Sequence, residues 1–256
     1  MRVVSLCPSL TETVFHLGLE RDLVGITDWC IHPADGVNAV EKVGGTKTPN
    51  VARIVELRPD LVLLNDEENC IEDADALAEA GIRCLSTFPK TVLETAAMVR
   101  VGGAALSEGD DATAKKIEAL ALAVEDRREA ALSRAAGQEA VRFAYMIWRQ
   151  PWMAVGRDTY ASDLLTLSGG VNVFADAVDR YGEIQPADLT EARPDLVLLC
   201  TEPFPFNASH ADELAALAGI ARDGIRIADG ELLSWHGSRT PAGVDYGADL
   251  IDSARS

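Results

Sequence analysis

The chain has 256 residues, enough for one large domain or two domains of ordinary size. Acidic residues number 41 against 23 basic ones, so the formal charge is −18, and no Lys/Arg cluster interrupts this pattern. We therefore expect neither a nucleic acid nor an anionic membrane as partner. The five cysteines are odd in number and form no CxxC pair, which favours reduced thiols over a disulfide framework.

Strand and helix patterns alternate through the first half. The apolar run at 2–6 predicts a strand, and Ser9 and Glu12 have the spacing of a capping box for the helix that follows, at 10–18. The next expected elements are a strand at 23–27, a helix at 51–57, a strand at 60–64, a helix at 71–81, a strand at 82–87 and a helix at 92–106. This order predicts an α/β fold with a mostly parallel sheet.

Residues 110–135 are rich in Ala, Glu, Lys and Arg and contain neither Gly nor Pro. The segment predicts one long helix of roughly 39 Å. Since a flexible linker would be rich in Gly and Ser, this helix indicates a stiff connection between the two halves.

The second half repeats the order of the first. We expect a strand at 141–148, helices at 159–170 and 186–192, a strand at 195–199, a helix at 210–219, a strand at 225–230 and a last helix after Pro241. The heptapeptide RPDLVLL occurs in both halves, at 58–64 and 193–199, and reads as a buried strand each time. The predicted divisions are an N-terminal α/β lobe at 1–108, a connecting helix at 109–138 and a C-terminal α/β lobe at 139–256.

The chain begins MRVVSLCPS, a short strand followed by turn residues, which is the pattern of neither a signal peptide nor a membrane span. As written, it is expected in the cytoplasm without membrane insertion. If a signal segment was removed, the location is periplasmic or otherwise extracytoplasmic.

The motifs resemble those of the helical-backbone (class III) substrate-binding proteins, and within that family the vitamin B12-binding components of ABC importers. The resemblance rests on VVSLCPSLTETVFHLG, LVGITDWC, VGGTKTPNVARIVELRPDLVLLN, VGRDTYASDLLTLSGGVNVF, ARPDLVLL and SWHGSRTP, which span nearly the whole chain. It implies two similar lobes with mostly parallel sheets, joined by one long helix, with a ligand cleft between them. It further implies non-catalytic binding of a corrinoid (cobalamin-like) ligand, with no intrinsic cofactor.

Other readings of the function stay open. The ligand is alternatively another metal chelate, such as haem or an iron-siderophore, or a metal ion. A cytosolic enzyme that processes a corrinoid or chelate is a further alternative, although the chain has no GxSxG, HExxH, GxGxxG or Walker motif. We expect a monomer, with an ABC permease as partner if the protein is exported.

Candidate ligand contacts lie in the loops that follow the strands, because ligands of open α/β sheets bind beyond the carboxyl ends of the strands. All four tryptophans fall there or at a strand end, and flat aromatic walls suit a large planar ligand. The alternative is that these aromatics fill the interface between the lobes. The predicted ligand-binding residues are Ser9, Leu10, Trp29, His32, Gly45, Thr46, Asp66, Glu67, Phe88, Trp148, Arg149, Trp152, Glu202, Phe204, Trp235 and Arg239.

Asp28, Cys30 and His32 alternate at a spacing of two, which places all three side chains on one side of an extended segment. They are a candidate metal site, or His32 is an axial ligand to cobalt or iron, and His210 and His236 are candidates to complete it. Alternatively Asp28 caps a turn, Cys30 is a small buried residue and His32 only precedes a proline.

Acidic residues near two helix starts are the candidates for partner docking. In importer components of this type, acidic residues on the two lobe surfaces dock onto arginines of the permease. The resemblance therefore implies this role for Glu72, Asp73, Asp212 and Glu213. Carboxylates at solvated helix N-termini are also expected on electrostatic grounds alone.

Overall fold

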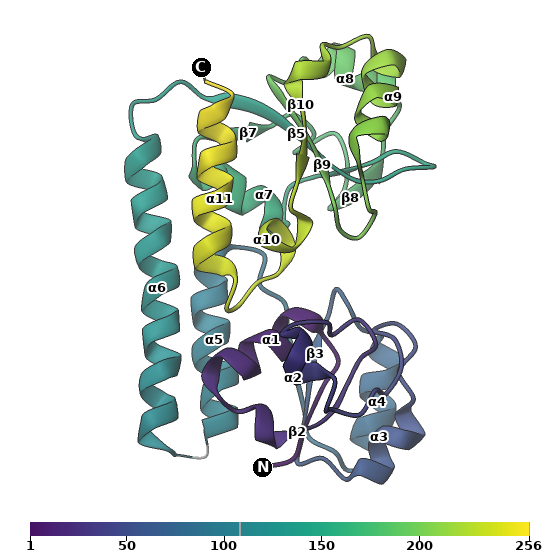
Figure 1. The fold of residues 1–256 in the computed structure, drawn as a ribbon, viewed down its shortest axis with the longest axis vertical. Helices are drawn as coiled ribbons and strands as arrows, with labels where there is room; N and C mark the ends of the chain where they lie inside the picture. Colours follow the sequence, from purple (N-terminus) through teal and green to yellow (C-terminus); the bar gives the residue numbers. More distant parts are fainter. Residues whose placement is uncertain (108, 256) are drawn as a thin grey trace. The chain divides into compact units, whose positions relative to one another are not determined.

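The computed structural model describes residues 1–107 and 109–255, so the predicted boundaries at 108 and 256 lie outside the described residues. Figure 1 shows the chain, which packs into two compact units. Unit 1 comprises Met1–Pro89, Thr95–Leu122 and His236–Arg239, and unit 2 comprises Lys90–Glu94, Ala123–Trp235 and Thr240–Ser256. The predicted divisions follow chain order, whereas packing assigns His236–Arg239 to the first unit. Whether a cleft separates the lobes stays a prediction.

The sheet of unit 1 is wholly parallel. Its strands are β1 (Val3–Ser5), β2 (Leu23–Ile26), β3 (Leu61–Asn65) and β4 (Cys84–Thr87), in the order β2-β1-β3-β4. Every residue of β1 and β3 is buried, as expected of central strands covered on both faces.

Helices cover both faces of this sheet. On one face α1 (Pro8–Leu17), α2 (Ala34–Val37) and α5 (Val92–Ser107) pack over Val3 and Leu61. On the other face α3 (Val51–Leu57) and α4 (Ile71–Glu79), side by side in Figure 1, pack over Val4 and Val62. A 3-10 turn, η1 (Glu20–Asp22), precedes β2. The strict alternation along the strands therefore builds two core layers.

Helix α6 (Asp111–Ala135) is the long helix that the composition predicts. It begins one residue later than expected, because the carboxylate of Asp110 accepts a hydrogen bond from the backbone N–H of Thr113 (2.7 Å) and so caps the helix. The chain passes from unit 1 to unit 2 within α6, after Leu122.

Unit 2 has a mixed sheet in the order β10-β9-β5-β6-β8. Strands β5 (Val141–Trp148), β9 (Leu196–Cys200) and β10 (Ile225–Ala228) are parallel, and β7 (Gly170–Asn172) pairs with β5 in parallel as well. Strands β6 (Met153–Val155) and β8 (Tyr181–Glu183) extend the sheet in antiparallel fashion. The sequence does not predict β6, β7 or β8, since three residues are too few for a periodic signal.

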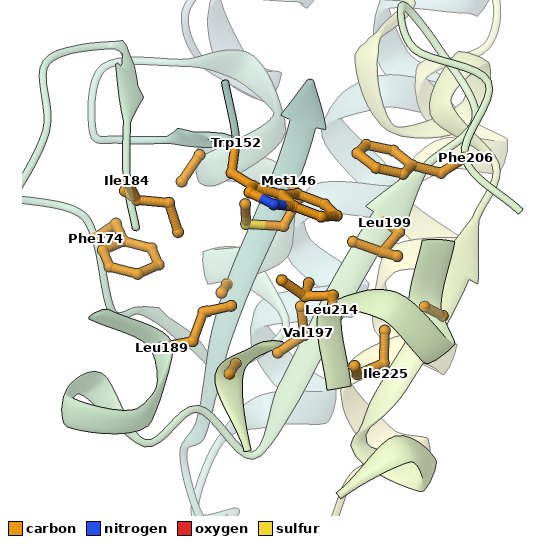
Figure 2. Packing of buried hydrophobic residues seen from close by; sticks show 14 residues of the cluster. Met146, Trp152, Phe174, Ile184, Leu189, Val197, Leu199, Phe206, Leu214 and Ile225 are labelled. Carbon is orange, nitrogen blue, oxygen red and sulfur yellow. The ribbon is translucent and has the colours of Figure 1, made fainter. Parts of the chain in front are cut away.

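A core cluster lies between the sheet of unit 2 and helices α8 (Pro186–Ala192) and α9 (Ala208–Ala218). In Figure 2 Trp152 and Phe206 lie at the end of the cluster to which the strand of Met146 points, and Leu189 lies at the other end. Helices α7 (Tyr160–Leu167), α10 (Gly230–Ser234) and α11 (Thr240–Ser253) pack against one another in the same unit, and η2 (Arg222–Gly224) precedes β10. The α/β prediction, with two mostly parallel sheets and one long helix, is confirmed.

The doubled heptapeptide has the same structure in both units. Arg58 and Arg193 end α3 and α8 in the left-handed conformation, at φ 47° and 46°. The following aspartates, Asp60 and Asp195, accept the backbone N–H of Arg2 and Arg142 at 2.7 and 2.8 Å. Those two arginine side chains donate to the last carbonyls of the same helices, Leu57 and Ala192. The motif therefore joins a helix end to the start of the neighbouring strand.

The predicted capping box is wrong. Helix α1 begins at Pro8, with Cys7 at the N-cap and no side-chain cap hydrogen bond. Ser9 consequently lies inside the first turn, and its hydroxyl lies 3.3 Å from the Cys7 sulfur. Proline fits the first helical position, where its missing N–H costs nothing.

Candidate functional site

The carboxyl ends of all four strands of unit 1 meet at one edge of the sheet, because the strands are parallel. The loops at this edge carry most of the ligand contacts predicted for the first half. They are Trp29 and His32 after β2, Gly45 and Thr46 in the next turn, Asp66 and Glu67 after β3, and Phe88 after β4. This edge is where an open α/β sheet binds ligands.

Trp29 is the most exposed tryptophan side chain at this edge, with 65% of its surface accessible. It lies in a turn in which the backbone N–H of Cys30 donates to the carbonyl of Thr27 (3.2 Å). The backbone N–H of Asp28 donates to the carbonyl of Gly44 (2.9 Å), so the 44–48 turn supports the same loop. A large apolar surface is thus held open to solvent by backbone contacts.

The metal site predicted at Asp28, Cys30 and His32 is wrong. The segment turns at Asp28, so the three side chains do not share one side: Asp28 is exposed, Cys30 is buried and His32 is half-buried. The sulfur of Cys30 lies 3.1 Å from the hydroxyls of both Thr11 and Thr27. Across residues 1–107 and 109–255, no group of three or more His, Cys, Asp and Glu side chains is arranged to hold a metal ion.

The two histidines proposed to complete that site have other roles. Nδ1 of His210 accepts the backbone N–H of Asn207 (3.2 Å) at the start of α9. Nε2 of His236 lies 3.1 Å from the amide nitrogen of Asn65, deep in unit 1. Burial lowers the pKa of His236 to about 4, so its imidazole is neutral at pH 7.

A buried network of amide side chains lies under the loops of unit 1, and the sequence analysis missed it. Oδ1 of Asn65 accepts the N–H groups of Glu67 and Glu68, and Nδ2 of Asn69 donates to the carbonyls of Leu6 and Thr46. Asparagine at both ends of the stretch Asn-Asp-Glu-Glu-Asn was the available signal, because such side chains hydrogen-bond to nearby backbone.

The acidic loop of unit 1 is partly engaged within the protein. The carboxylate of Asp66 accepts a hydrogen bond from the hydroxyl of Ser86, and Nζ of Lys47 donates to the carbonyl of Glu67 (2.7 Å). Burial raises the pKa of Glu68. Lys47 therefore joins the 44–48 turn to the loop after β3.

Three other predicted contacts of unit 1 have internal partners. Leu10 belongs to the core beneath α1, and Ser9 is buried at the start of that helix. Nε of Arg239 lies 2.6 Å from a carboxylate oxygen of Glu12, in a partly buried ion pair. These three residues are tied to the packing of α1.

In unit 2 the carboxyl ends of β5 and β9 carry an aromatic cluster. The ring centroids of Trp148 and Phe204 lie 5.5 Å apart in an edge-on contact, and those of Phe204 and Phe206 lie 4.6 Å apart. The ring of Phe206 in turn stacks on that of Trp152, with the centroids 5.8 Å apart. Glu202 lies in the same loop as the two phenylalanines, after β9.

Exposure separates the four tryptophans into two pairs. Trp29 and Trp148 expose 65% and 39% of their surface, whereas Trp152 and Trp235 expose 8% each. Trp152 is part of the core of unit 2, and Trp235 ends α10. The exposed pair remains suited to contact a ligand, and the buried pair supports the structure.

Arg149 and Glu213, predicted as a ligand contact and a docking residue, bind each other. Two hydrogen bonds of 2.8 Å join the guanidinium to the carboxylate, and this contact lowers the pKa of Glu213. Asp212 is likewise paired, with Arg222 at 2.6 Å. Of the four predicted docking residues, Glu72 and Asp73 in the first turn of α4 fit the prediction best, and burial raises the pKa of Asp73.

One wholly parallel sheet and one mostly parallel sheet, each with aromatic side chains in loops at the carboxyl ends of its parallel strands, define a two-lobed α/β architecture. The model of the periplasmic binding protein family matches residues 3–221, which is most of the chain. The chain belongs to the periplasmic binding protein family. The periplasmic binding protein family is a family of non-catalytic proteins. In the part of the chain that the structure describes, each helix is too short or too polar to span a bilayer.

Individual relatives are identical to this chain at about a quarter of the aligned positions. The vitamin B12-binding protein of Vibrio cholerae is 24% identical over 196 residues, covering 77% of this chain and 69% of that protein. The "Uncharacterized ABC transporter substrate-binding lipoprotein YvrC" of Bacillus subtilis is 26% identical over 259 residues, covering 98% and 79%.

Solved structures share the fold. The periplasmic vitamin B12 binding protein BtuF of Vibrio cholerae superposes with a TM-score of 0.83 at 21% identity, over 100% of this chain and 98% of that one. The periplasmic heme-binding protein RhuT from Roseiflexus sp. RS-1 gives 0.83 at 23% identity, over 99% and 98%.

Proposed function

We propose that this protein binds a large planar metal chelate of the corrinoid type without changing it, as the substrate-binding component of an ABC importer. We assign ligand contacts to the loops at the carboxyl edges of both sheets. A relative named as a vitamin B12-binding protein supports this ligand class. A relative named as a substrate-binding lipoprotein and a solved structure named as a periplasmic vitamin B12 binding protein support a location outside the cytoplasm.

The observation that carries the proposal is the pair of exposed tryptophans. Trp29 follows β2 in unit 1 and Trp148 ends β5 in unit 2, both at the edge where such sheets bind ligands. Burying one indole against a ligand removes about 100 Å² or more of apolar surface from water, which stabilises the complex by roughly 2–3 kcal/mol. A flat macrocycle with apolar faces matches such walls.

A corrinoid fits the chain better than haem. Haem iron in proteins takes an axial His, Cys, Met or Tyr side chain. Tyr145 and Tyr160 are buried in unit 2. Nδ1 of His210 and Nε2 of His236 are each in contact with a group of the protein. Cyanocobalamin brings both of its own axial ligands and needs none from the protein. His32, half-buried after β2, is the histidine at the carboxyl edge of the unit 1 sheet that could serve as an axial ligand to haem iron.

Docking to a permease is proposed at α4. Glu72 is exposed and Asp73 half-buried in its first turn, where carboxylates are stabilised by the helix dipole and remain available to cations of a partner. The paired state of Asp212 and Glu213 makes α9 the weaker candidate.

The test is a comparison of single variants in a cyanocobalamin titration. Trp29→Ala and Trp148→Ala should each weaken binding by about 10- to 100-fold, the range for truncating an aromatic anchor. Tyr181→Ala is the matched control: Tyr181 exposes the same 39% as Trp148 but begins β8, opposite Val155 at the far end of β6.

Full affinity in both tryptophan variants, or an equal loss in Tyr181→Ala, would remove the site assignment. A parallel titration with haem separates the ligands. Haem binding that His32→Ala abolishes would replace the corrinoid proposal with a haem site.

A further inference from the structure

Asn65, the last residue of β3, joins several segments of unit 1 through one buried side chain. Its Oδ1 accepts from the backbone N–H of Glu67 (2.9 Å) and Glu68 (3.2 Å). Its Nδ2 lies 3.1 Å from Nε2 of His236 and 3.4 Å from the hydroxyl of Thr87, at the end of β4. Both ends of the amide are thereby used.

Asn69 completes the arrangement from the other end of the loop. Its Oδ1 accepts the backbone N–H of Asn65 (2.8 Å), and its Nδ2 donates to the carbonyls of Leu6 (2.9 Å) and Thr46 (3.0 Å). The loop after β1, the 44–48 turn and the loop after β3 are therefore held by one side chain. These loops carry the proposed ligand contacts Gly45, Thr46, Asp66 and Glu67.

The segment His236–Arg239 reaches this network from a distant part of the chain and packs in unit 1. Besides the His236 contact, the N–H of Ser238 donates to the Thr13 hydroxyl (3.0 Å), and Arg239 pairs with Glu12. Gly237, at φ 97°, lies so close to Thr13 that a Cβ there would collide with the hydroxyl. We call this segment the strap.

We propose that Asn65, Asn69 and His236 are positioning residues that hold the loops of unit 1 in one conformation, and that an added proton on His236 releases the strap and those loops. A neutral Nε2 accepts the hydrogen bond of the Asn65 amide, whereas an imidazolium has only N–H donors and repels that amide. The inference rests on the proposed function only in that these loops contact the ligand.

Electrostatics and burial agree with this reading. Burial lowers the pKa of His236 to about 4, so this histidine takes up its proton only at a lower pH than a solvent-exposed histidine does. The charged groups on the elements joined to the network are Asp66, Glu67 and Glu68 after β3, Lys47 in the 44–48 turn, and Glu12 on α1, which Arg239 neutralises.

The first experiment uses the ligand-free protein and follows amide hydrogen exchange of the strap and of the 65–69 loop at pH 7 and pH 5, corrected for intrinsic rates. A histidine with a pKa near 6.5 when released and about 4 when bound should raise the opening equilibrium about twentyfold between pH 7 and pH 5. His236→Gln, which keeps an oxygen acceptor but does not titrate, should remove this pH dependence. His16→Gln, which removes an exposed histidine of α1, should keep it.

Equal protection of the wild type at both pH values, or an unchanged pH dependence in His236→Gln, would overturn the proposal. This result is independent of any ligand.

The second experiment measures cyanocobalamin affinity at pH 7. Asn69→Asp, which keeps the acceptor and loses both donated hydrogen bonds, should bind about tenfold more weakly, whereas His16→Gln, at an exposed position of α1, should bind within about twofold of the wild type. Wild-type affinity in Asn69→Asp would contradict the positioning role. If the wild type binds no corrinoid, the proposed function fails, while the exchange experiment still decides on the strap.

Discussion

At the scale of single residues, neighbouring tryptophans in unit 2 have different roles although both lie at the carboxyl edge of the sheet. Trp152 stacks on Phe206 within the core, whereas Trp148 meets Phe204 only by an edge and leaves 39% of its surface exposed. The difference follows from the antiparallel pairing of β5 with β6, which begins directly after Trp152.

Trp152→Ala should therefore lower the free energy of unfolding by about 3–5 kcal/mol, since it leaves a cavity in the core. Trp148→Ala should lower it by about 1 kcal/mol, because little packing is lost. Urea denaturation of the two variants checks this. Equal losses would show that exposure does not separate the two residues.

Protonation of His236 gives unit 1 a specific pH dependence. An unfolded histidine takes up its proton near pH 6.5, but His236 in the folded protein does so only near pH 4. Its contribution to stability is thus complete above pH 6.5 and is lost as the pH falls toward 4.

Between pH 8 and pH 5 the wild type should lose about 2 kcal/mol of unfolding free energy more than His236→Gln does. Denaturant titrations at both pH values measure this difference. The contribution of the carboxylates to the pH dependence is the same in both proteins and therefore cancels. His16→Gln should follow the wild type, and a wild type parallel to His236→Gln would contradict the lowered pKa.

At the scale of secondary-structure elements, the doubled RPDLVLL motif has a structural role that its two copies share. Each copy ends a helix with a left-handed arginine, and its aspartate holds the first residues of the adjacent central strand. The ligand edge is at the opposite ends of these strands. The repetition thus reflects the duplicated architecture rather than a doubled site.

Asp60→Ala and Asp195→Ala should accordingly destabilise the protein by similar amounts, about 1 kcal/mol each, for the loss of one backbone acceptor. Asp75→Ala, at an exposed position of α4, should change the free energy of unfolding by less than about 0.5 kcal/mol. Thermal or urea unfolding measures all three. A loss in only one copy would show that the two motifs are not equivalent.

Two adjacent glycines of α5 provide a matched test of its packing on α6. A Cβ at Gly103 would lie against three side-chain atoms of Ile117, whereas a Cβ at Gly102 would meet no atom within 4 Å. Gly103→Ala should destabilise by about 1–3 kcal/mol through overpacking. Gly102→Ala should stabilise by about 0.5–1 kcal/mol, because alanine favours the helix. Both variants shifting in the same direction in urea unfolding would contradict this packing.

At the scale of the whole molecule, patterns of buried residues predicted most of the fold. The five consecutive residues that are buried in β3 and in β9 predicted the central strands, and the composition of α6 predicted its length. The short antiparallel strands were missed because pairing with β5, rather than any local periodicity, forms them. The capping box predicted at Ser9 is wrong because α1 begins before Ser9, at Pro8.

The candidate site was less predictable than the fold. Loop positions followed from strand ends, but the partners of Arg149 and Arg239 depend on long-range packing that no local pattern encodes. The contact of Asn65 with His236 joins residues 171 positions apart. Such pairs decide which polar side chains remain available to a ligand.

The central claim is that exposed Trp29 and Trp148 bind a corrinoid that supplies its own axial ligands. The most direct measurement is a calorimetric titration of the wild type with cyanocobalamin, with tryptophan fluorescence recorded in parallel and haem as the competing ligand. We predict a one-to-one complex in the micromolar range or tighter, quenching of the two exposed indoles, and weaker binding of haem. No heat and no quenching with cyanocobalamin, or tighter binding of haem, would contradict the account.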